Sequence, residues 1–366
     1  MRVAAGLLTS AVAALLATSP LAAAPAPQLN LAPVLASHGF DGFAMVANKD
    51  AILWQTPTAK CPPSVGSAIV LCHPRDPAFL RWPWASVTKQ IMAVLTMQQV
   101  DAGLIALDSP ASRYLPALSG SAPAPTIRQL LQHRAGLRNP EDSGKDASGT
   151  PTWYTATDDA LGWCVQGRTE PGGSWRYNNC DTLVLGAVLE KVTGQSVATL
   201  FVENISSPLG LEATGFADRF EHANSPLPGM AMALTDAENA LLARYGAAGG
   251  LVGPPLDLLT IDRALMAGKL LSATARGKMW QGDPGLGFMA LGQWSFDAPL
   301  RGCAKPVHLI ERRGGIGRFQ VRNILVPDTG QSIIMFIANG DFDFGEIWQG
   351  QGLSHDVLSA AVCRPR

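Results

Sequence analysis

The sequence predicts an α+β fold in which one antiparallel sheet is built from both ends of the chain. Stretches rich in β-branched and aromatic residues occur near the start and near the end of the 366 residues, and helical patterns fill the segment between them. Strands at both termini that enclose a run of helices indicate a sheet flanked by helices, with a helical insertion.

The strands are expected in two hairpins. Residues 43–46 and 51–55 flank the turn sequence Asn48-Lys49-Asp50, and residues 318–326 and 331–338 flank Pro327-Asp328-Thr329-Gly330. Polar residues, proline and glycine between two apolar runs are typical of antiparallel hairpins.

Capping residues define the expected helices. Residues 87–100 are apolar nearly all round, which predicts a buried helix, and Gly103 is a suitable C-cap. Thr126 and Gln129 form a capping-box pattern, and Gly194 closes another helix. The expected helices span residues 87–100, 126–132, 182–193, 255–266, 272–280 and 354–362.

The chain is expected to have three parts. Residues 1–24 read as a secretory signal peptide, because Arg2 precedes an apolar run and an alanine-rich stretch with small-residue cleavage sites. Residues 25–39 read as an Ala/Pro-rich tether. Residues 40–366 form the main domain, with a helical subdomain at about 108–280. An uncleaved membrane anchor is the alternative for the first part, and no later segment has the length of a transmembrane helix.

Six cysteines behind an export signal indicate disulfides in an oxidising compartment, periplasmic or extracellular. Closeness in sequence favours Cys61–Cys72 and Cys164–Cys180, which leaves Cys303–Cys363. Sequence alone allows 15 connectivities, and buried free thiols are the alternative. No C-x-x-C or H-x-x-H spacing occurs, so no metal site and no cofactor is expected.

Composition excludes several classes of partner. Net charge is −1, hydrophobic residues make up 47% and charged residues 16%. A large core is therefore possible, and nothing suggests binding to nucleic acid or to an acidic membrane surface. The expected partner is a small-molecule or peptide substrate.

The chemistry is expected to centre on Ser86-Val87-Thr88-Lys89. Residues three apart share one helical face, so the lysine amine lies beside the serine oxygen. A serine needs such help, because its free hydroxyl is a weak nucleophile.

Two further motifs accompany this pair. Tyr177-Asn178-Asn179 places a phenol and an amide two residues apart before a helix, although a buried tyrosine with a helix-capping Asn179 is an alternative reading. Arg313-Gly314-Gly315 precedes the C-terminal hairpin, where paired glycines let another backbone or a ligand come close. No G-x-S-x-G occurs, which argues against an α/β-hydrolase.

The chain resembles the serine β-lactamase-related family, which includes class C β-lactamases, penicillin-binding D,D-peptidases and esterases of the same fold. The resemblance rests on the ordered set Ser86-x-x-Lys89, Tyr177-x-Asn179 and Arg313-Gly314-Gly315, and it covers residues 40–362. It implies the β-lactamase/transpeptidase-like fold and a mechanism through an acyl-enzyme.

The resemblance also implies a role for each residue. Ser86 attacks a carbonyl and becomes acylated, and Lys89 helps to take its proton. Tyr177 acts as general base and then as acid toward the leaving group. Asn179 orients the acyl amide or Lys89. The backbone N–H groups of Ser86 and Ile316 are expected to form the oxyanion hole.

Arg313 departs from the family, which usually has lysine or histidine at this position. An arginine stays charged but can bind a carboxylate in a bidentate manner. We expect Arg313, with Gly314 and Gly315, to bind an anionic acyl donor. An ion pair between Arg313 and Glu311 is the competing reading.

The sequence therefore predicts an exported serine hydrolase that cleaves an ester or amide bond through acyl-Ser86. Esterase, D,D-peptidase and β-lactamase activity are not separated, because in one fold they differ by pocket shape. The alternative from another class is a non-catalytic cell-wall or peptidoglycan-binding module that retains the fold.

Overall fold

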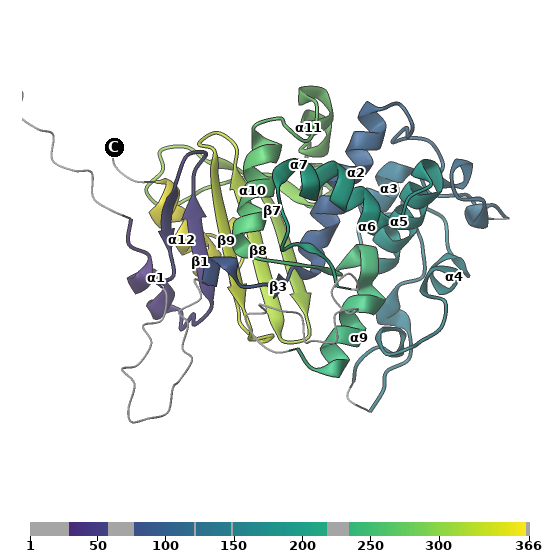
Figure 1. The fold of residues 1–366 in the computed structure, drawn as a ribbon, viewed down its shortest axis with the longest axis horizontal. Coiled ribbons are helices and arrows are strands. Elements are labelled where there is room, and N and C mark those ends of the chain that lie inside the picture. The colour runs from purple at the N-terminus through teal and green to yellow at the C-terminus, as the bar shows by residue number, and fades with distance from the viewer. Residues whose placement is uncertain (1–28, 58–76, 121, 148, 218–233, 364–366) are drawn as a thin grey trace, which may run out of the picture.

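A six-stranded antiparallel sheet forms the centre of the molecule (Figure 1). The structure is a computed structural model that describes residues 29–57, 77–120, 122–147, 149–217 and 234–363. In the order β2-β1-β9-β8-β7-β6, the strands are Ile52–Gln55, Phe43–Ala47, Gln331–Ile337, Phe319–Val326, Val307–Ile316 and Trp294–Ala298. Both ends of the chain thus contribute strands, which confirms the predicted fold class.

Both predicted hairpins are present, and β1 joins them into one sheet. β1 pairs with β2 and also with β9, where Phe43 lies opposite Phe336. Every residue of β9 is buried. A strand buried on both faces is possible because helices cover both faces of this sheet.

The two terminal helices pack against one face of the sheet. α1 (Ala32–Ser37) lies beside α12 (Leu353–Val362) on the left of Figure 1. Leu31 and Leu35 are buried in the same apolar cluster as Val357. The predicted tether is therefore wrong for residues 29–39, because the leucines there are part of the core, while residues 25–28 lie outside the described residues.

The other face of the sheet carries the helical part of the molecule. Helix α2 (Thr88–Asp101) runs through its centre, and α10 (Pro255–Met266) packs against β9. A small second sheet has the order β3-β5-β4, from Trp82–Pro83, Leu251–Gly253 and Gly215–Phe216. The other α-helices of the described residues are α3 (Ile127–Leu131), α4 (Ala160–Val165), α5 (Asn179–Thr193), α6 (Val197–Phe201), α7 (Ser207–Leu209), α9 (Asp236–Tyr245) and α11 (Ala273–Met279).

Most helix boundaries agree with the predicted ones. α10 has the predicted limits, and both hydrogen bonds of the Thr126–Gln129 capping box are present. α5 ends at Gly194 in the left-handed conformation, as predicted, but it begins at Asn179 rather than at residue 182. Its first turn carries site residues, and the sequence pattern there is not amphipathic.

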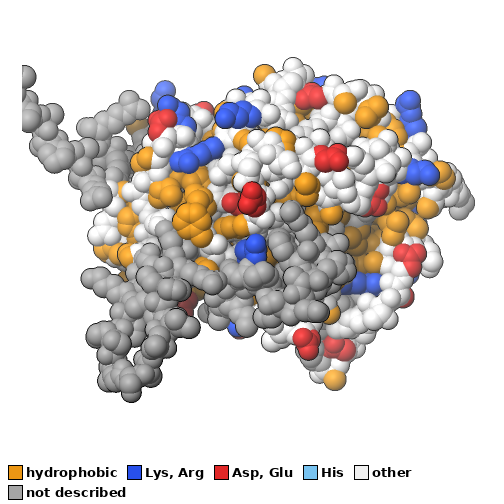
Figure 2. Space-filling model, viewed as in Figure 1, with side chains coloured by type: hydrophobic (Ala, Val, Ile, Leu, Met, Phe, Trp, Pro, Cys, Tyr) orange, Lys and Arg blue, Asp and Glu red, His pale blue; other side chains and the backbone are white. Residues whose placement is uncertain are grey.

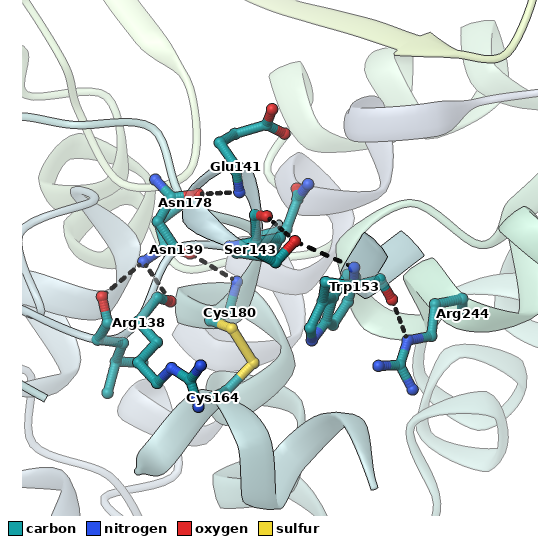
Figure 3. Close-up of a disulfide and its surroundings, with 12 residues drawn as sticks. Arg138, Asn139, Glu141, Ser143, Trp153, Cys164, Asn178, Cys180 and Arg244 are labelled. Atoms are coloured by element: carbon teal, nitrogen blue, oxygen red, sulfur yellow. Dashed lines mark hydrogen bonds between the residues drawn. A yellow bond between two sulfur atoms is a disulfide. The ribbon is translucent and has the colours of Figure 1, made fainter. Parts of the chain in front are cut away.

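Two disulfides join segments of the domain. Cys164 of α4 is bonded to Cys180 in the first turn of α5, and Cys303 is bonded to Cys363 at the end of α12 (Figure 3 shows the first). Closeness in sequence favoured the first of these pairs, and the second is the pair that this choice left. Cys61 and Cys72 lie outside the described residues, as does the predicted signal segment.

The described surface has mixed charge. On the face in Figure 2, basic and acidic side chains are interspersed, in keeping with the net charge of −1. Within the described residues, no single helix has the length and hydropathy to cross a membrane, and α5 with the stretch Val197–Leu209 qualifies only as a pair bent by 79°.

Candidate active site

Ser86 lies in a short 3-10 turn, Ala85–Val87, that leads directly into α2. Strand β5 fixes this turn, because Trp84 donates its backbone N–H to Leu251 O (2.8 Å) and its indole N–H to Gly253 O (2.9 Å). Ala85 has φ of +45°, a conformation that costs a non-glycine residue energy and occurs at functional sites. The turn presents Ser86 at the N-terminal end of α2.

Lys89 is one turn further along and is 1% exposed. Its Nζ lies 3.1 Å from Ser86 Oγ, 2.7 Å from Asn179 Oδ1 and 2.5 Å from Ala248 O. The predicted Ser86–Lys89 contact is therefore present. Ala248 lies in the segment Ala247-Ala248-Gly249-Gly250-Leu251, and its backbone carbonyl holds the lysine amine in place.

The surroundings of Lys89 favour the neutral amine. Burial lowers the pKa of Lys89 well below its usual value, the Arg312 charge lowers it further, and Asp181 acts in the opposite direction. A neutral amine has two N–H groups, which match the acceptors Asn179 Oδ1 and Ala248 O. Its lone pair is then left to face the Ser86 hydroxyl.

Tyr177 contacts the other side of the same oxygen. Its hydroxyl lies 2.5 Å from Ser86 Oγ, and its backbone carbonyl accepts a hydrogen bond from Asn139 Nδ2 (2.8 Å). Burial raises the pKa of the Tyr177 phenol, while Arg312 and the Ser86 hydrogen bond oppose this rise. Tyr177 is therefore a protonated phenol, able to donate.

Asn179 connects Lys89 to a further pair of side chains. The cap of α5 is Asn178, whose Oδ1 accepts from Cys180 N, so the alternative reading of Asn179 as the cap is wrong (Figure 3). The Asn179 side chain is free to accept from Lys89 and to donate from Nδ2 to the Tyr154 hydroxyl (3.0 Å). Tyr154 in turn donates to Glu141.

Strand β7 lies against the Ser86 turn and contributes Arg312 and Gly314 to the site. Arg312 is fully buried and donates from Nε to Ser86 O (2.9 Å). A Cβ on Gly314 would lie 2.7 Å from Trp84 O and 3.0 Å from Ser86 N. Only glycine lets β7 lie this close to the serine backbone, so the predicted close approach of a backbone is present at Gly314.

The register of β7 contradicts the Ile316 oxyanion donor. Ile316 is paired with Phe319 across the two-residue turn Gly317-Arg318. Residues that flank such a turn exchange both backbone hydrogen bonds, so the Ile316 N–H is directed into the sheet. The neighbouring Gly315 N–H is directed to the opposite edge, where pairing with β6 has ended at Glu311. The register favours Gly315, with Ser86, as the donor.

Arg313 does not face Ser86. Successive side chains of a strand point to opposite faces, so the face of Arg312 is not that of Arg313. The Arg313 guanidinium donates to both oxygens of Glu311 (2.8 and 3.1 Å) and to Glu346 (2.8 Å), and it lies over the Trp348 ring. The structure thus shows the competing reading, the ion pair with Glu311, and gives no support to Arg313 as the ligand of an anionic acyl donor.

Sequence reasoning gave no role to four residues of the site: Arg312, Ala248, Tyr154 and Glu141. Side chains of a strand alternate between its two faces, so applying this alternation to residues 310–316 would have placed Arg312 and Arg313 on opposite faces. Ala248 acts through its backbone, and Tyr154 and Glu141 come from irregular segments, so no spacing signals them. Within the described residues, no group of three or more His, Cys, Asp or Glu side chains could hold a metal ion.

The fold and the site together define the class of the serine hydrolases of the β-lactamase type. The chain belongs to the Beta-lactamase family, whose family model matches residues 77–337.

Relatives from this family carry different names. The chain is 35% identical over 147 residues to esterase EstB of Burkholderia gladioli. This match covers 36% of this chain and 37% of that protein. It is 27% identical over 145 residues to a D-aminopeptidase of Cereibacter sphaeroides, 39% of this chain and 28% of that protein. The matches thus span well under half the length of these relatives.

A solved structure covers more of the chain. A D-stereospecific amidohydrolase from Streptomyces sp. superposes with a TM-score of 0.64 at 22% identity, over 90% of this chain and 97% of that one. At this identity the likeness shows the fold, including the helical part inserted between the terminal strands.

Proposed function

We propose that the protein is an exported serine hydrolase that cleaves an ester or amide bond through an acyl-Ser86 intermediate. One observation carries the proposal: Ser86 Oγ is contacted by the amine of Lys89 and the phenol of Tyr177 at hydrogen-bond distance. A nucleophile with a base on one side and a proton donor on the other is what acyl transfer requires.

In the acylation step, Lys89 takes the Ser86 proton as Oγ forms the bond to the substrate carbonyl carbon. The N–H groups of Ser86 and Gly315 stabilise the negative oxygen, each worth about 3–4 kcal/mol in such sites. Tyr177 gives its proton to the leaving group as the carbonyl–heteroatom bond breaks, and the Lys89 ammonium returns a proton to Tyr177. Water then repeats the sequence with the acyl-enzyme.

This assignment refines the expected division of roles. Tyr177 was expected to act first as base, but its pKa is raised and that of Lys89 is lowered. The proposal therefore gives the first proton transfer to Lys89 and the protonation of the leaving group to Tyr177.

The names of the relatives support a substrate with an ester or a D-aminoacyl amide bond, such as those suggested by an esterase and a D-aminopeptidase. Ester and D-peptide hydrolysis are proposed ahead of β-lactam hydrolysis, because the family's lysine-threonine-glycine element is altered in this chain.

Export is supported by the signal-like N-terminus and by the cysteine pairs, since disulfides persist in oxidising compartments. The mass of the mature N-terminus, measured on protein recovered from the periplasm or the medium, tests this part. A chain that retains residues 1–24 in the cytoplasm would contradict it.

A substrate panel tests the hydrolase. Short-chain p-nitrophenyl esters, a D-Ala-D-Ala peptide and a cephalosporin are offered to the wild type and to Ser86→Ala. We expect Ser86-dependent turnover of at least one of the first two, reduced by at least about 10³-fold in Ser86→Ala. No Ser86-dependent turnover of any substrate, together with binding to peptidoglycan, would favour the non-catalytic binding module.

A further inference from the structure

Helix α9 extends from the strand that carries the oxyanion donor to the residue that holds the lysine. Its N-terminal part contacts the β7 hairpin, whose turn Gly317-Arg318 comes two residues after Gly315, and α9 lies beside that end of β7 in Figure 1. Its C-terminal end leads directly into Gly246–Ala248, where the Ala248 carbonyl binds Lys89 Nζ. The helix therefore forms a wall along one side of the site.

An ion pair connects the first turn of α9 to the β7–β8 turn. Arg318 Nε donates to Glu238 Oε1 (2.9 Å), and the Glu238 side chain is 13% exposed. Glu238 is also the capping-box residue of α9, because its Oε2 accepts from Thr235 N (2.8 Å). Burial raises the pKa of Glu238, but the hydrogen bonds from Thr235 and Arg318 bring it below its ordinary value. The pair therefore joins two charged groups on fixed elements at neutral pH.

The contact at this turn leaves little space for a ligand. A Cβ on Gly317 would lie 3.5 Å from Glu238 Cγ, so a single methyl group would fill the gap. The other end of α9 is also fixed, because Arg244 Nε donates to Trp153 O (2.9 Å) and Tyr245 stacks on the Tyr154 ring with centroids 5.1 Å apart. A helix held at both ends does not move aside easily for a bulky substrate.

The contact between α9 and the turn lies on the acyl side of Ser86. Tyr177, which serves the leaving group, lies 5.6 Å from the Arg312 guanidinium, and pairing of β7 with β6 ends next to Arg312, at Glu311. From Arg312, β7 runs past Gly315 to its turn. The leaving group and the acyl chain lie on opposite sides of the carbonyl carbon. A leaving group near Tyr177 therefore directs the acyl chain along β7 toward α9.

We propose that the Arg318–Glu238 ion pair closes the acyl end of the site, so that the enzyme accepts acyl groups of about the size of acetyl or alanyl and excludes long ones. This inference rests on the proposed function and adds a limit on acyl length. Arg318 and Glu238 are specificity-determining residues, because they act through the space that they leave and not on the reacting atoms.

The experiment varies acyl length while the leaving group stays the same. The values of kcat/KM for p-nitrophenyl acetate, butyrate and octanoate are measured on the wild type, Arg318→Lys, Arg318→Ala and Arg318→Glu. Lysine keeps the cation, alanine removes it, and glutamate places a second carboxylate opposite Glu238. Arg301→Ala is the matched control, because Arg301 forms an ion pair of similar length with Asp356 (2.8 Å) at the terminal helices.

The measured quantity is the ratio of kcat/KM for the octanoate to kcat/KM for the acetate. We expect a ratio below about 0.1 in the wild type, since one methylene group too many for a pocket costs roughly 10–200-fold. The ratio should stay within about threefold of the wild type in Arg318→Lys and Arg301→Ala, rise at least about tenfold in Arg318→Ala and rise further in Arg318→Glu. Because each ratio is taken on one protein sample, differences in the folded fraction cancel.

A second series fixes the side of the site on which the pair acts. Ethyl acetate and octyl acetate share the acetyl group and differ in the length of the leaving group. Their ratio of kcat/KM should be the same in all of these proteins, within about threefold, because the leaving group lies at the Tyr177 end.

Three results would overturn the inference. Equal turnover of octanoate and acetate by the wild type would show that the acyl end is open. An unchanged ratio in both Arg318→Ala and Arg318→Glu would show that the ion pair serves only the stability of the fold. A change in the octyl-to-ethyl acetate ratio instead would place the pair on the leaving-group side. Absence of Ser86-dependent turnover of every ester would contradict the proposed function itself, and the inference with it.

Discussion

At the residue scale, Lys89 is an amine placed where water cannot solvate its charge. A buried ammonium costs free energy, and the adjacent Arg312 guanidinium adds repulsion. The two acceptors Asn179 Oδ1 and Ala248 O compensate by binding the two hydrogens of the neutral form. The spacing Ser86-x-x-Lys89 predicts the contact, but the protonation state depends on a buried arginine and a backbone carbonyl that no spacing reveals.

Replacing Lys89 by arginine tests this protonation state. Arginine keeps a cation of similar reach but does not release its proton, so Lys89→Arg should lower kcat/KM for an ester by about 10²–10⁴-fold, the usual contribution of a general base. For the wild type, kcat/KM should be low at a pH below the pKa of Lys89, where the amine is protonated. It should rise as the pH passes that lowered pKa. Retention of more than a tenth of the activity in a folded Lys89→Arg protein would contradict the assignment.

Arg313 makes a separate residue-scale prediction. Glu311 is fully buried, so Arg313→Ala leaves a buried carboxylate without its main partner. We expect a loss of about 3 kcal/mol in the free energy of unfolding, measured in urea. The ratio of kcat/KM for carboxylate-bearing and neutral esters should stay the same. A selective loss on the carboxylate-bearing ester would restore Arg313 as a substrate ligand.

At the scale of elements, β7 decides which residues of Arg312-Arg313-Gly314-Gly315 reach the nucleophile. The side chains of a strand alternate, so a shift of one residue exchanges the site face for the far face. Sequence reasoning identified the segment correctly but selected Arg313, because the pattern offers two adjacent arginines with equal claims. Only the register shows that Arg312 and Gly314 share the face of Ser86.

Gly314→Ala should therefore impair catalysis more than Gly315→Ala. The new Cβ at residue 314 would meet Trp84 O and Ser86 N at 3.0 Å or less, whereas at residue 315 it meets only Phe319 O at 4.0 Å. A displacement of β7 from Ser86 by about 1 Å is enough to lower kcat/KM by about 100-fold. Steady-state kinetics on one ester should show this loss for Gly314→Ala and a change within about threefold for Gly315→Ala. Similar effects of both variants would contradict the close approach.

Local signals explain why most elements could be predicted. The capping box at Thr126, the left-handed Gly194 and both hairpin turns act within a few residues, so sequence patterns report them. The first turn of α5 was missed because Asn178 and Asn179 are equally suited to cap a helix. Tertiary contacts with Lys89 and Tyr154 decide between them.

At the scale of the whole molecule, buried polar groups connect the sheet to the helical part. Asn323 of β8 donates to Gln90 Oε1 of α2 (3.0 Å) and to Asp262 Oδ1 of α10 (2.9 Å). Gln90 is the neighbour of Lys89, so this junction also supports the site. Burial raises the pKa of Asp262 to about 7, and no sequence pattern predicts a protonated acid between the two halves.

This acid predicts how stability depends on pH. The folded protein holds a proton on Asp262 that the unfolded chain releases near pH 4, so this group costs stability as pH rises from about 4 to 7, by about 4 kcal/mol at most. Asp262→Asn lacks this term. Its advantage in unfolding free energy over the wild type should grow between pH 5 and pH 8, while Asp50→Asn, at an exposed turn, should show no such trend. A constant difference would contradict the raised pKa.

The central claim is that Ser86 forms a covalent acyl-enzyme with the help of Lys89, and trapping that intermediate tests it most directly. The protein is quenched in acid during turnover of a p-nitrophenyl ester, digested and analysed by mass spectrometry. The account predicts a single acyl adduct on the peptide that contains Ser86, absent from Ser86→Ala and formed far more slowly in Lys89→Arg. An adduct on another residue, or the same adduct in Ser86→Ala, would contradict the account.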